Sequence, residues 1–246
     1  YLILIFIFEL MKDRMVYLAS LISILFMANS AYSQKAIGLY VGSVTNQFEG
    51  DRVKKLFDVG FRMHSSMSVG LVLDIPIKED VYLTAIPGYK NIAGTVYEEN
   101  EEYYDQIDQG IEEPSVPRLV DISVLEFDYF ALPILLKLIS DNKRWQFMAG
   151  IESAFNLKSN LNELKTGEDI DIGSYITNIN YSAIFGLGYI FKIKKSRFSI
   201  DLMYTQGLVN MSSGLELPFG NVPRVKSTTG ETKLTWFFLS KTENTK

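Results

Sequence analysis

The 246-residue chain contains no cysteine and a single histidine, His64. The missing thiols exclude disulfides and thiolate zinc sites, and one histidine leaves little for histidine-based metal binding or catalysis. The 24 basic and 29 acidic residues give a formal net charge of −5, and no basic stripe suggests a nucleic-acid partner. Aromatic residues are abundant, with 16 Phe and 14 Tyr, which is a first compositional sign of a membrane interface.

The segment MKDRMVYLASLISILFMANSAYSQ, which starts at Met11, has the layout of an export signal. Two basic residues precede an apolar core at 16–27, and Ala31-Tyr32-Ser33 forms a small-x-small cleavage site. The apolar core is too short to span a bilayer as a helix, although an N-terminal membrane anchor is the rival interpretation. We therefore expect residues 1–33 to be an upstream stretch and a signal peptide, and residues 34–246 to be the mature domain.

From Ala36 onward, apolar residues alternate with a period of two, and sustained helical periodicity is absent. This pattern predicts eight strands, near 36–46, 67–77, 81–97, 122–139, 145–158, 178–193, 198–212 and 230–240. We also expect local bulges at Pro87 and Pro133, because proline within a closed sheet removes a ladder hydrogen bond.

The connections between these strands alternate between long and short. Three are tight, at 78–80, 140–144 and 194–197, and four are long, at 47–66, 98–121, 159–177 and 213–229. In an up-and-down antiparallel sheet every second connection lies at the same end, so all the long loops gather at one end. Outer-membrane barrels show this asymmetry. The sequence therefore predicts an all-β, eight-stranded antiparallel up-and-down transmembrane β-barrel.

The two faces of the strands differ in composition. Large apolar side chains such as Leu39, Phe147 and Trp236 fall on one face, whereas the glycines and most charges fall on the other. The interior of an eight-stranded barrel is only just wide enough for side chains to fill, so glycine and serine fit it better than rings do. This favours apolar side chains facing lipid, with Trp145, Phe191 and Phe198 in an interfacial girdle. The alternative is a soluble exported lipocalin-like barrel that binds an apolar ligand.

Eight charged residues on the polar face are predicted to form an ion-pair network that plugs the lumen, because lone buried charges are costly. A pore lined by the same residues is the functional alternative. The residues are Asp74, Lys90, Glu126, Asp128, Glu152, Lys192, Asp201 and Lys233.

The second long connection is rich in carboxylates and has no basic residue before Arg118. Like charges repel, which predicts a solvated, extended loop outside the cell. Weak binding of divalent cations through oxygen ligands is the alternative, although no fixed calcium-loop spacing is present. The predicted loop carries Glu98, Glu99, Glu101, Glu102, Asp105 and Asp108.

Four segments resemble the outer-membrane β-barrel domain family that includes PorT-like proteins: EFDYFALPILLKL, FMAGIESAFNL, FGLGYIF and DLMYTQGLVNM, at 126–138, 147–157, 185–191 and 201–211. The resemblance implies a small barrel in the outer membrane of a Gram-negative bacterium. It also implies that some relatives assist protein secretion or gliding machinery, while most have no assigned activity.

From these observations we expect a structural or partner-interaction role through the long external loops, of which an accessory role in secretion is one form. The expected surroundings are outer-membrane lipid and external protein partners, with no nucleic acid, no cofactor and a monomeric state. We expect no enzymatic activity. The enzymatic alternative rests on His64 beside Ser65 and Ser66, for which no acid is in view.

Overall fold

The computed structural model describes residues 36–50, 60–108, 116–194, 196–211, 215–217, 220–222 and 225–240. The predicted signal peptide and its cleavage site lie outside the described residues. Within the described ranges, no helix is both long enough and apolar enough to cross a membrane.

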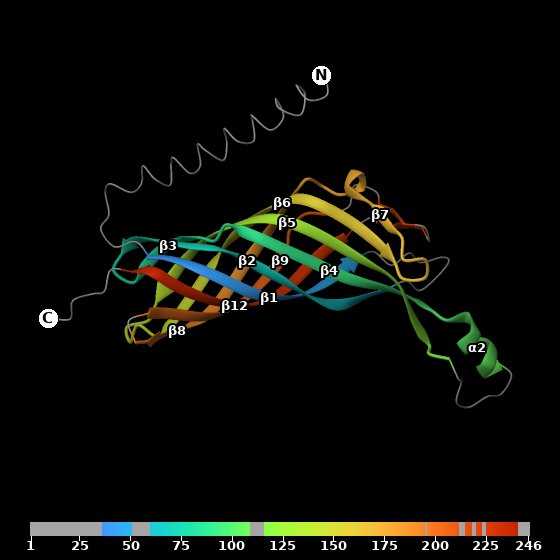
Figure 1. Ribbon diagram of the computed structural model, residues 1–246, viewed down its shortest axis with the longest axis horizontal. Coiled ribbons are helices and arrows are strands. Elements are labelled where there is room, and N and C mark those ends of the chain that lie inside the picture. The colour runs from blue at the N-terminus through green and yellow to red at the C-terminus, as the bar shows by residue number, and fades with distance from the viewer. Residues whose placement is uncertain are drawn as a thin grey trace, which may run out of the picture.

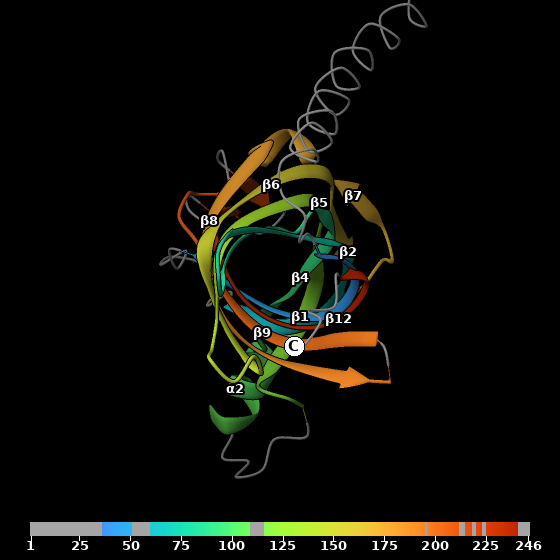
Figure 2. The same cartoon turned by 90° about the vertical axis from the view of Figure 1, so that its left-hand side faces the viewer.

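Antiparallel strands form a closed ring with eight positions (Figures 1 and 2). Two short strands share the third position because Pro87 separates them. In chain order the ring contains β1 (Ala36–Gly50), β2 (Gly60–Lys78), β3 (Val81–Ala85) with β4 (Gly88–Glu99), β5 (Leu119–Ile139), β6 (Trp145–Glu163), β8 (Ile179–Ile193), β9 (Ser196–Gly207) and β12 (Val225–Ser240). Pairing of β12 with β1 closes the ring, so the predicted up-and-down barrel is confirmed.

Smaller elements lie at the end of the barrel that carries the long connections. A helix follows β4, a short strand pairs with the end of β6, and a separate two-stranded hairpin precedes β12. These elements are α2 (Glu101–Asp108), β7 (Asp169–Asp171), the 3₁₀ turn η2 (Gly173–Tyr175), β10 (Leu215–Leu217) and β11 (Gly220–Val222). We call this end the loop side, and the end with the tight connections the turn side.

The strands are strongly staggered around the ring. Starting from Ile37 on β1, one can step from each residue to its directly paired residue on the next strand, once around the barrel. This circuit returns to β1 at Gln47, ten residues beyond Ile37. It passes through Leu73, Ala85, Ile134, Ile151, Ala183, Gln206 and Thr228. A stagger of this size requires strands that tilt by about 40° from the barrel axis. Each residue therefore adds about 2.5 Å of height along the axis.

The expected bulges at Pro87 and Pro133 are wrong. Pro87 interrupts the strand, but the register of β5 is the same on both sides of it, and Pro133 sits directly opposite Glu152 in an unbroken strand. Both proline carbonyls still accept backbone hydrogen bonds, from Leu71 at 2.9 Å and from Ile86 at 3.0 Å. Only the N–H of each proline is missing, so the ladder loses single bonds without slipping.

On the turn side, the exterior of the barrel is an apolar band. Paired rings mark its edge near the short turns, where Trp145 lies 5.1 Å from Tyr189 and Phe191 lies 5.7 Å from Phe198 between ring centroids. Aromatic belts of this kind sit at membrane–water interfaces. The soluble lipocalin-like alternative is therefore wrong. The exposed side chains of the band include Leu39, Val41, Val69, Leu71, Leu136, Leu138, Trp145, Phe147, Phe185, Leu187, Ile200, Leu202, Leu234, Trp236 and Phe238.

Glycines on the inner face make room for larger side chains in the lumen. A Cβ atom at Gly88 would collide with the Tyr40 hydroxyl, and one at Gly70 would come within 2.8 Å of the same ring. These two glycines allow the buried Tyr40 ring to cross the lumen. The expectation that glycines line the interior is thereby confirmed at these positions.

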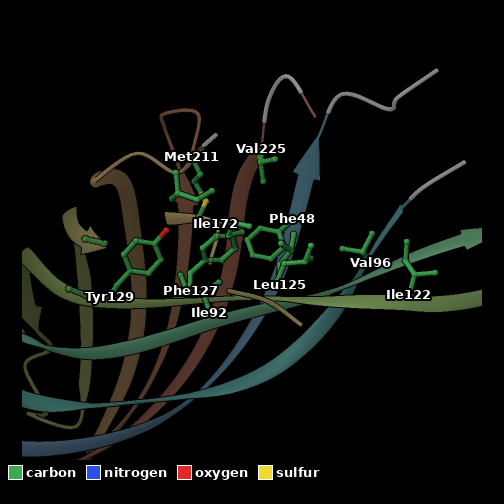
Figure 3. Packing of buried hydrophobic residues seen from close by; sticks show 14 residues of the cluster. Phe48, Ile92, Val96, Ile122, Leu125, Phe127, Tyr129, Ile172, Met211 and Val225 are labelled. Carbon is green, nitrogen blue, oxygen red and sulfur yellow. The ribbon is translucent and has the colours of Figure 1, made fainter. Parts of the chain in front are cut away.

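On the loop side, the polarity of the wall is reversed. Buried apolar residues fill the interior there, and Phe48 meets Phe127 edge to face at 5.3 Å (Figure 3). The exterior carries polar pairs such as Arg62 with Asp121, whose charged atoms lie 3.0 Å apart. We call the interior cluster the apolar cap; it contains Phe48, Ile92, Val96, Ile122, Leu125, Phe127, Tyr129, Ala131, Ala154, Leu161, Ile172, Ile176, Met211 and Val225.

Candidate functional site

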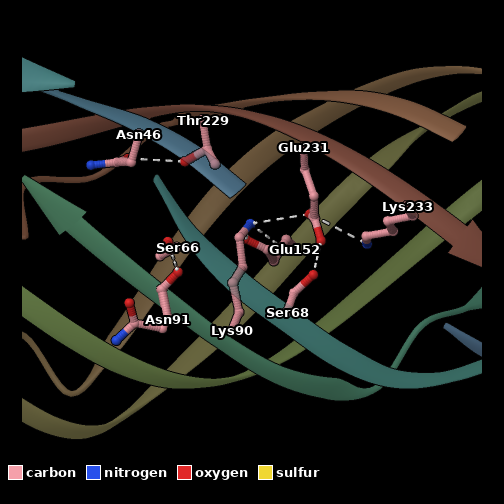
Figure 4. Close-up of polar contacts among 9 residues, drawn as sticks. All are labelled: Asn46, Ser66, Ser68, Lys90, Asn91, Glu152, Thr229, Glu231 and Lys233. Atoms are coloured by element: carbon pink, nitrogen blue, oxygen red, sulfur yellow. Dashed lines mark hydrogen bonds and ion pairs between the residues drawn. The ribbon is translucent and has the colours of Figure 1, made fainter. Parts of the chain in front are cut away.

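A cluster of four buried charges lies in the middle of the lumen (Figure 4). Lys90 of β4 places its ammonium 3.2 and 3.3 Å from the two carboxylate oxygens of Glu152 on β6. The same ammonium lies 3.9 Å from Glu231 of β12, which also pairs with Lys233 at 3.4 Å. Two positive and two negative charges therefore compensate one another within one cluster, which we call the central charge layer.

Neutral groups complete this layer. Ser68 donates a hydrogen bond to Glu231, and the Lys233 ammonium lies 4.6 Å from the centroid of the Tyr40 ring, within the range of a cation–π contact. Each of the four charged side chains is at most 4% exposed. These four side chains are therefore almost completely shielded from water within the described strands.

A second polar layer lies nearer the short turns. The Lys137 ammonium is 2.6 Å from Asp74, whose carboxylate also accepts a hydrogen bond from Thr84 at 2.8 Å. Asp201 accepts hydrogen bonds from Ser199 at 2.9 Å and from Gln146. With Arg197, this layer again holds two positive and two negative charges.

A buried aromatic ring, Phe237, lies against the cations of the second layer inside the lumen. The Arg197 guanidinium lies 4.7 Å, and the Lys137 ammonium 5.7 Å, from the centroid of the Phe237 ring. Several polar atoms here are buried without a partner among the described residues, including Asp74 Oδ2, Gln146 Oε1 and Thr235 Oγ1. Such buried polar atoms are the ordinary partners of ordered water.

The structure places five of the eight predicted lumen residues inside the barrel: Asp74, Lys90, Glu152, Asp201 and Lys233. It brings Lys90, Glu152 and Lys233 into one layer and holds Asp74 and Asp201 in the other. The prediction omitted Glu231, although it lies two residues before Lys233 and shares its face. It also omitted Lys137 and Arg197, because the expected bulge at Pro133 obscured the phase of β5, and Arg197 was assigned to a turn.

Glu126 and Asp128 do not belong to the lumen. They alternate with Leu125, Phe127 and Tyr129, which point into the apolar cap, so both carboxylates point outward. Asp128 accepts hydrogen bonds from Tyr89 at 2.5 Å and from Asn91 at 2.8 Å on the outer surface. The physical reason is that these positions lie above the apolar band, where charges are stable on the exterior.

Lys192 also lies outside the network. It shares the inner face of β8 with the buried Ile190, but its own side chain is exposed at the turn-side mouth. The strand ends one residue later at Ile193, so water rather than a buried carboxylate surrounds this ammonium.

The acidic segment is not extended throughout, which corrects the predicted loop. Residues 101–108 form α2, with Glu101, Glu102, Asp105 and Asp108 on the helix, while Glu98 and Glu99 belong to the end of β4. The Asn100 side chain accepts a hydrogen bond from the backbone N–H of Glu102 at 3.1 Å, which caps the helix. The Glu102 carboxylate in the first turn is favourable because it lies near the positive end of the helix dipole.

The described residues include no group of three or more acidic or histidine side chains arranged to hold a metal ion. The His64 ring makes its polar contact with Thr95, at 3.4 Å between Nδ1 and Oγ1. This contact joins the His64 ring to a neutral hydroxyl group.

A family model described as "Outer membrane protein beta-barrel domain" matches residues 27–213. The chain belongs to this family. This outer-membrane barrel is therefore located in the outer membrane of a Gram-negative bacterium, and its apolar band contacts lipid. The narrower PorT-like resemblance stays a prediction. No curated protein sequence matches the barrel.

Solved outer-membrane proteins resemble this barrel in fold only. Ail, the attachment invasion locus protein of Yersinia pestis, is 11% identical with a TM-score of 0.40, over 84% of this chain and 100% of that chain. OprG from Pseudomonas aeruginosa is 9% identical with a TM-score of 0.46, over 83% and 94% of the two chains. Neisserial surface protein A is 10% identical with a TM-score of 0.46, over 84% and 100%. These similarities transfer no activity to this barrel.

Proposed function

We propose that the barrel is a closed, non-enzymatic membrane anchor that presents its loop side to protein partners outside the cell. The observation that carries this proposal is the length of the strands. The 21 residues of β5 rise about 50 Å along the axis, whereas the apolar band of a small outer-membrane barrel is about 25 Å tall. About half of this strand, the longest in the barrel, therefore serves a purpose other than spanning the membrane.

The projecting β4–β5 hairpin suits a binding role because its tip is folded. The Asn100 backbone N–H donates to the Arg118 carbonyl at 2.8 Å, and the Arg118 guanidinium donates to the Tyr104 hydroxyl at 3.1 Å. These contacts fix α2 to the strands that carry it, and α2 lies beyond the rest of the barrel in Figure 1. A preorganised tip loses less conformational freedom on binding than a flexible loop does.

The filled lumen supports an anchor rather than a channel. The central charge layer compensates its own charges, and the apolar cap fills the interior above it. An accessory role in secretion is one form of this function, since an accessory protein needs a fixed site and an exposed contact surface but no passage of its own.

The test is a loop replacement. Glu99 and Leu119 are directly paired, so a two-residue Asn-Gly turn can replace residues 100–118 without disturbing the ladder. We expect this variant to fold and to show the heat-dependent gel mobility of the parent. It should, however, lose the protein that chemical cross-linking attaches to the parent on intact cells. Asp141→Ser in a turn-side connection is the control and should keep that partner.

Two results would contradict the proposal. A cross-linked partner that persists after the loop replacement would place the contact elsewhere on the barrel. Regular conductance steps from the purified parent in planar bilayers would show that the lumen conducts ions, and the closed-anchor function would then be wrong.

A further inference from the structure

The edge of the apolar band on the loop side is not level around the barrel. On β6 and β8 the outward apolar side chains continue far toward the loops, to Leu157 and Ile179, both of which are exposed. On the paired strands β1 and β12, which we call the seam, they stop at Val41 and Leu234. The outward positions that follow on the seam are small or polar: Ser43, Thr45 and Gln47 on β1, and Thr232, Gly230 and Thr228 on β12.

The difference in height is large compared with a bilayer. The apolar run on β12, from Phe238 to Leu234, covers four residue steps. The run on β6, from Trp145 to Leu157, covers twelve and includes a single polar outward side chain, Ser153. At about 2.5 Å per residue these runs are about 10 Å and about 30 Å tall. Both runs begin at an exposed aromatic ring on the turn side, so the apolar band starts at a similar level on both strands. The difference in height therefore lies at the loop-side edge of the band.

The seam is a closed wall and not an opening between strands. Its ladder runs from the pair of Ala36 with Ser240 to the pair of Gly50 with Val225. Ser43 is directly paired with Thr232, and Thr45 with Gly230, so their outward groups form one smooth surface. A Cβ at Gly230 would meet nothing nearer than the Thr45 carbonyl at 4.0 Å, which shows that no side chain covers this surface.

We propose that the lipid leaflet on the loop side is thinned along the seam, so that polar lipid headgroups contact Ser43, Thr45 and Thr232. The seam continues the lipid-facing band without a break, and its hydroxyl groups can hydrogen-bond to headgroup phosphate and sugar oxygens. Acyl chains would leave three neighbouring hydroxyls without lipid partners, which is unfavourable, whereas the run on β6 has the single hydroxyl of Ser153. A bilayer adapts to a hydrophobic surface shorter than its own thickness by thinning locally. The proposal does not depend on the partner role proposed above.

Single cysteines test this directly, because the parent has none. Ser43→Cys on the seam and Ser153→Cys on β6 are a matched pair. Both side chains point outward, and they lie seven and eight residues from the turn-side ends of their strands. We would place each variant in nanodiscs of phosphatidylcholine, which expose both leaflets, and measure its reaction with a charged maleimide. Ser43→Cys should react at least about tenfold faster than Ser153→Cys, because water reaches only the seam.

Controls and opposite outcomes are equally specific. Gln47→Cys, at the loop-side end of the seam, should react fast. All variants should react equally once unfolded in detergent. If Ser43→Cys and Ser153→Cys are equally protected from the maleimide, acyl chains cover the seam. If both react equally fast, the loop-side edge of the apolar band is level around the barrel. Either result overturns the proposal. Disulfide-linked dimers of Ser43→Cys in native membranes would mean that a second copy covers the seam, which also overturns it.

Discussion

The turn-side and loop-side halves of this barrel use the same strands with opposite polarity. On the turn side, apolar side chains face outward and the interior holds the charged layers around Lys90 and Asp74. On the loop side, the apolar cap fills the interior, and groups such as Asp128 and Arg62 face outward. The alternation along β5 keeps one phase throughout, from Leu125 to Lys137. What changes along the strand is the solvent outside it, from water to lipid, and side-chain chemistry follows that change.

The interior of the turn-side half gives the largest expected effect. Lys90→Met should lower the free energy of unfolding by about 3–5 kcal/mol, because it leaves Glu152 buried without its cation. The double variant Lys90→Met/Glu152→Leu should recover much of this loss. Urea titration in lipid vesicles measures both. If the two variants are equally unstable, lost packing and not lost charge compensation is responsible.

The interior of the loop-side half should respond like the core of a soluble protein. Phe127→Ala removes a ring that packs against Phe48 and Tyr129, and it should cost about 3–4 kcal/mol. The neighbouring Glu126→Ala should change stability by less than about 0.5 kcal/mol, because its side chain is exposed. The same titrations decide the matter, and a larger effect at Glu126 would mean that the assigned phase of β5 is reversed.

The exterior of the turn-side half should reject charge. Leu202→Arg places a cation in the middle of the apolar band and should cost about 2–4 kcal/mol. Gln47→Arg, on the exterior of the loop-side half, should cost less than about 1 kcal/mol, since water surrounds this position. Similar, small costs for both substitutions would remove the distinction between the two exteriors.

The exterior of the loop-side half gives the smallest expected effect. Asp121→Asn breaks the ion pair with Arg62, but both side chains are about two-fifths exposed. Solvent-exposed pairs contribute about 0.2–1 kcal/mol, so the change should stay within that range and shrink in high salt. A loss comparable to that of Lys90→Met would show that this surface is enclosed by a partner or by lipid.

Much of the fold could be predicted from the sequence because period-two alternation and the long–short pattern of connections are local signals. They locate all eight ring positions, and the strands extend beyond the predicted bounds mainly at the loop side, where Asn46 and Phe48 still alternate. The helix α2 could not be found in this way. Its eight residues are too few for a periodic signal, and its formation depends on the cap from Asn100 and the tertiary contact with Arg118.

The candidate site was only partly predictable because alternation separates two faces without saying which face is inside. Charges were assigned to the lumen along the whole strand, which suits Lys90 and Glu152 but not Asp128. That assignment is correct only for the part of each strand that lipid surrounds. The residue at which the lipid ends on each strand depends on the stagger of the closed ring. The pairing of Lys137 with Asp74, residues 63 apart in sequence, is likewise a product of ring closure.

The pairing of Ala36 with Ser240 has a kinetic consequence. The ring closes between its first and last strands, so its final contact joins segments about 200 residues apart. Contacts of such high sequence separation form slowly, because the loop-closure entropy must be lost before they contribute any stability. Until β12 arrives, β1 presents a row of unpaired backbone groups, which is the usual starting point of edge-to-edge aggregation. Ring closure therefore removes the exposed edges of β1 and β12 together, in a single pairing.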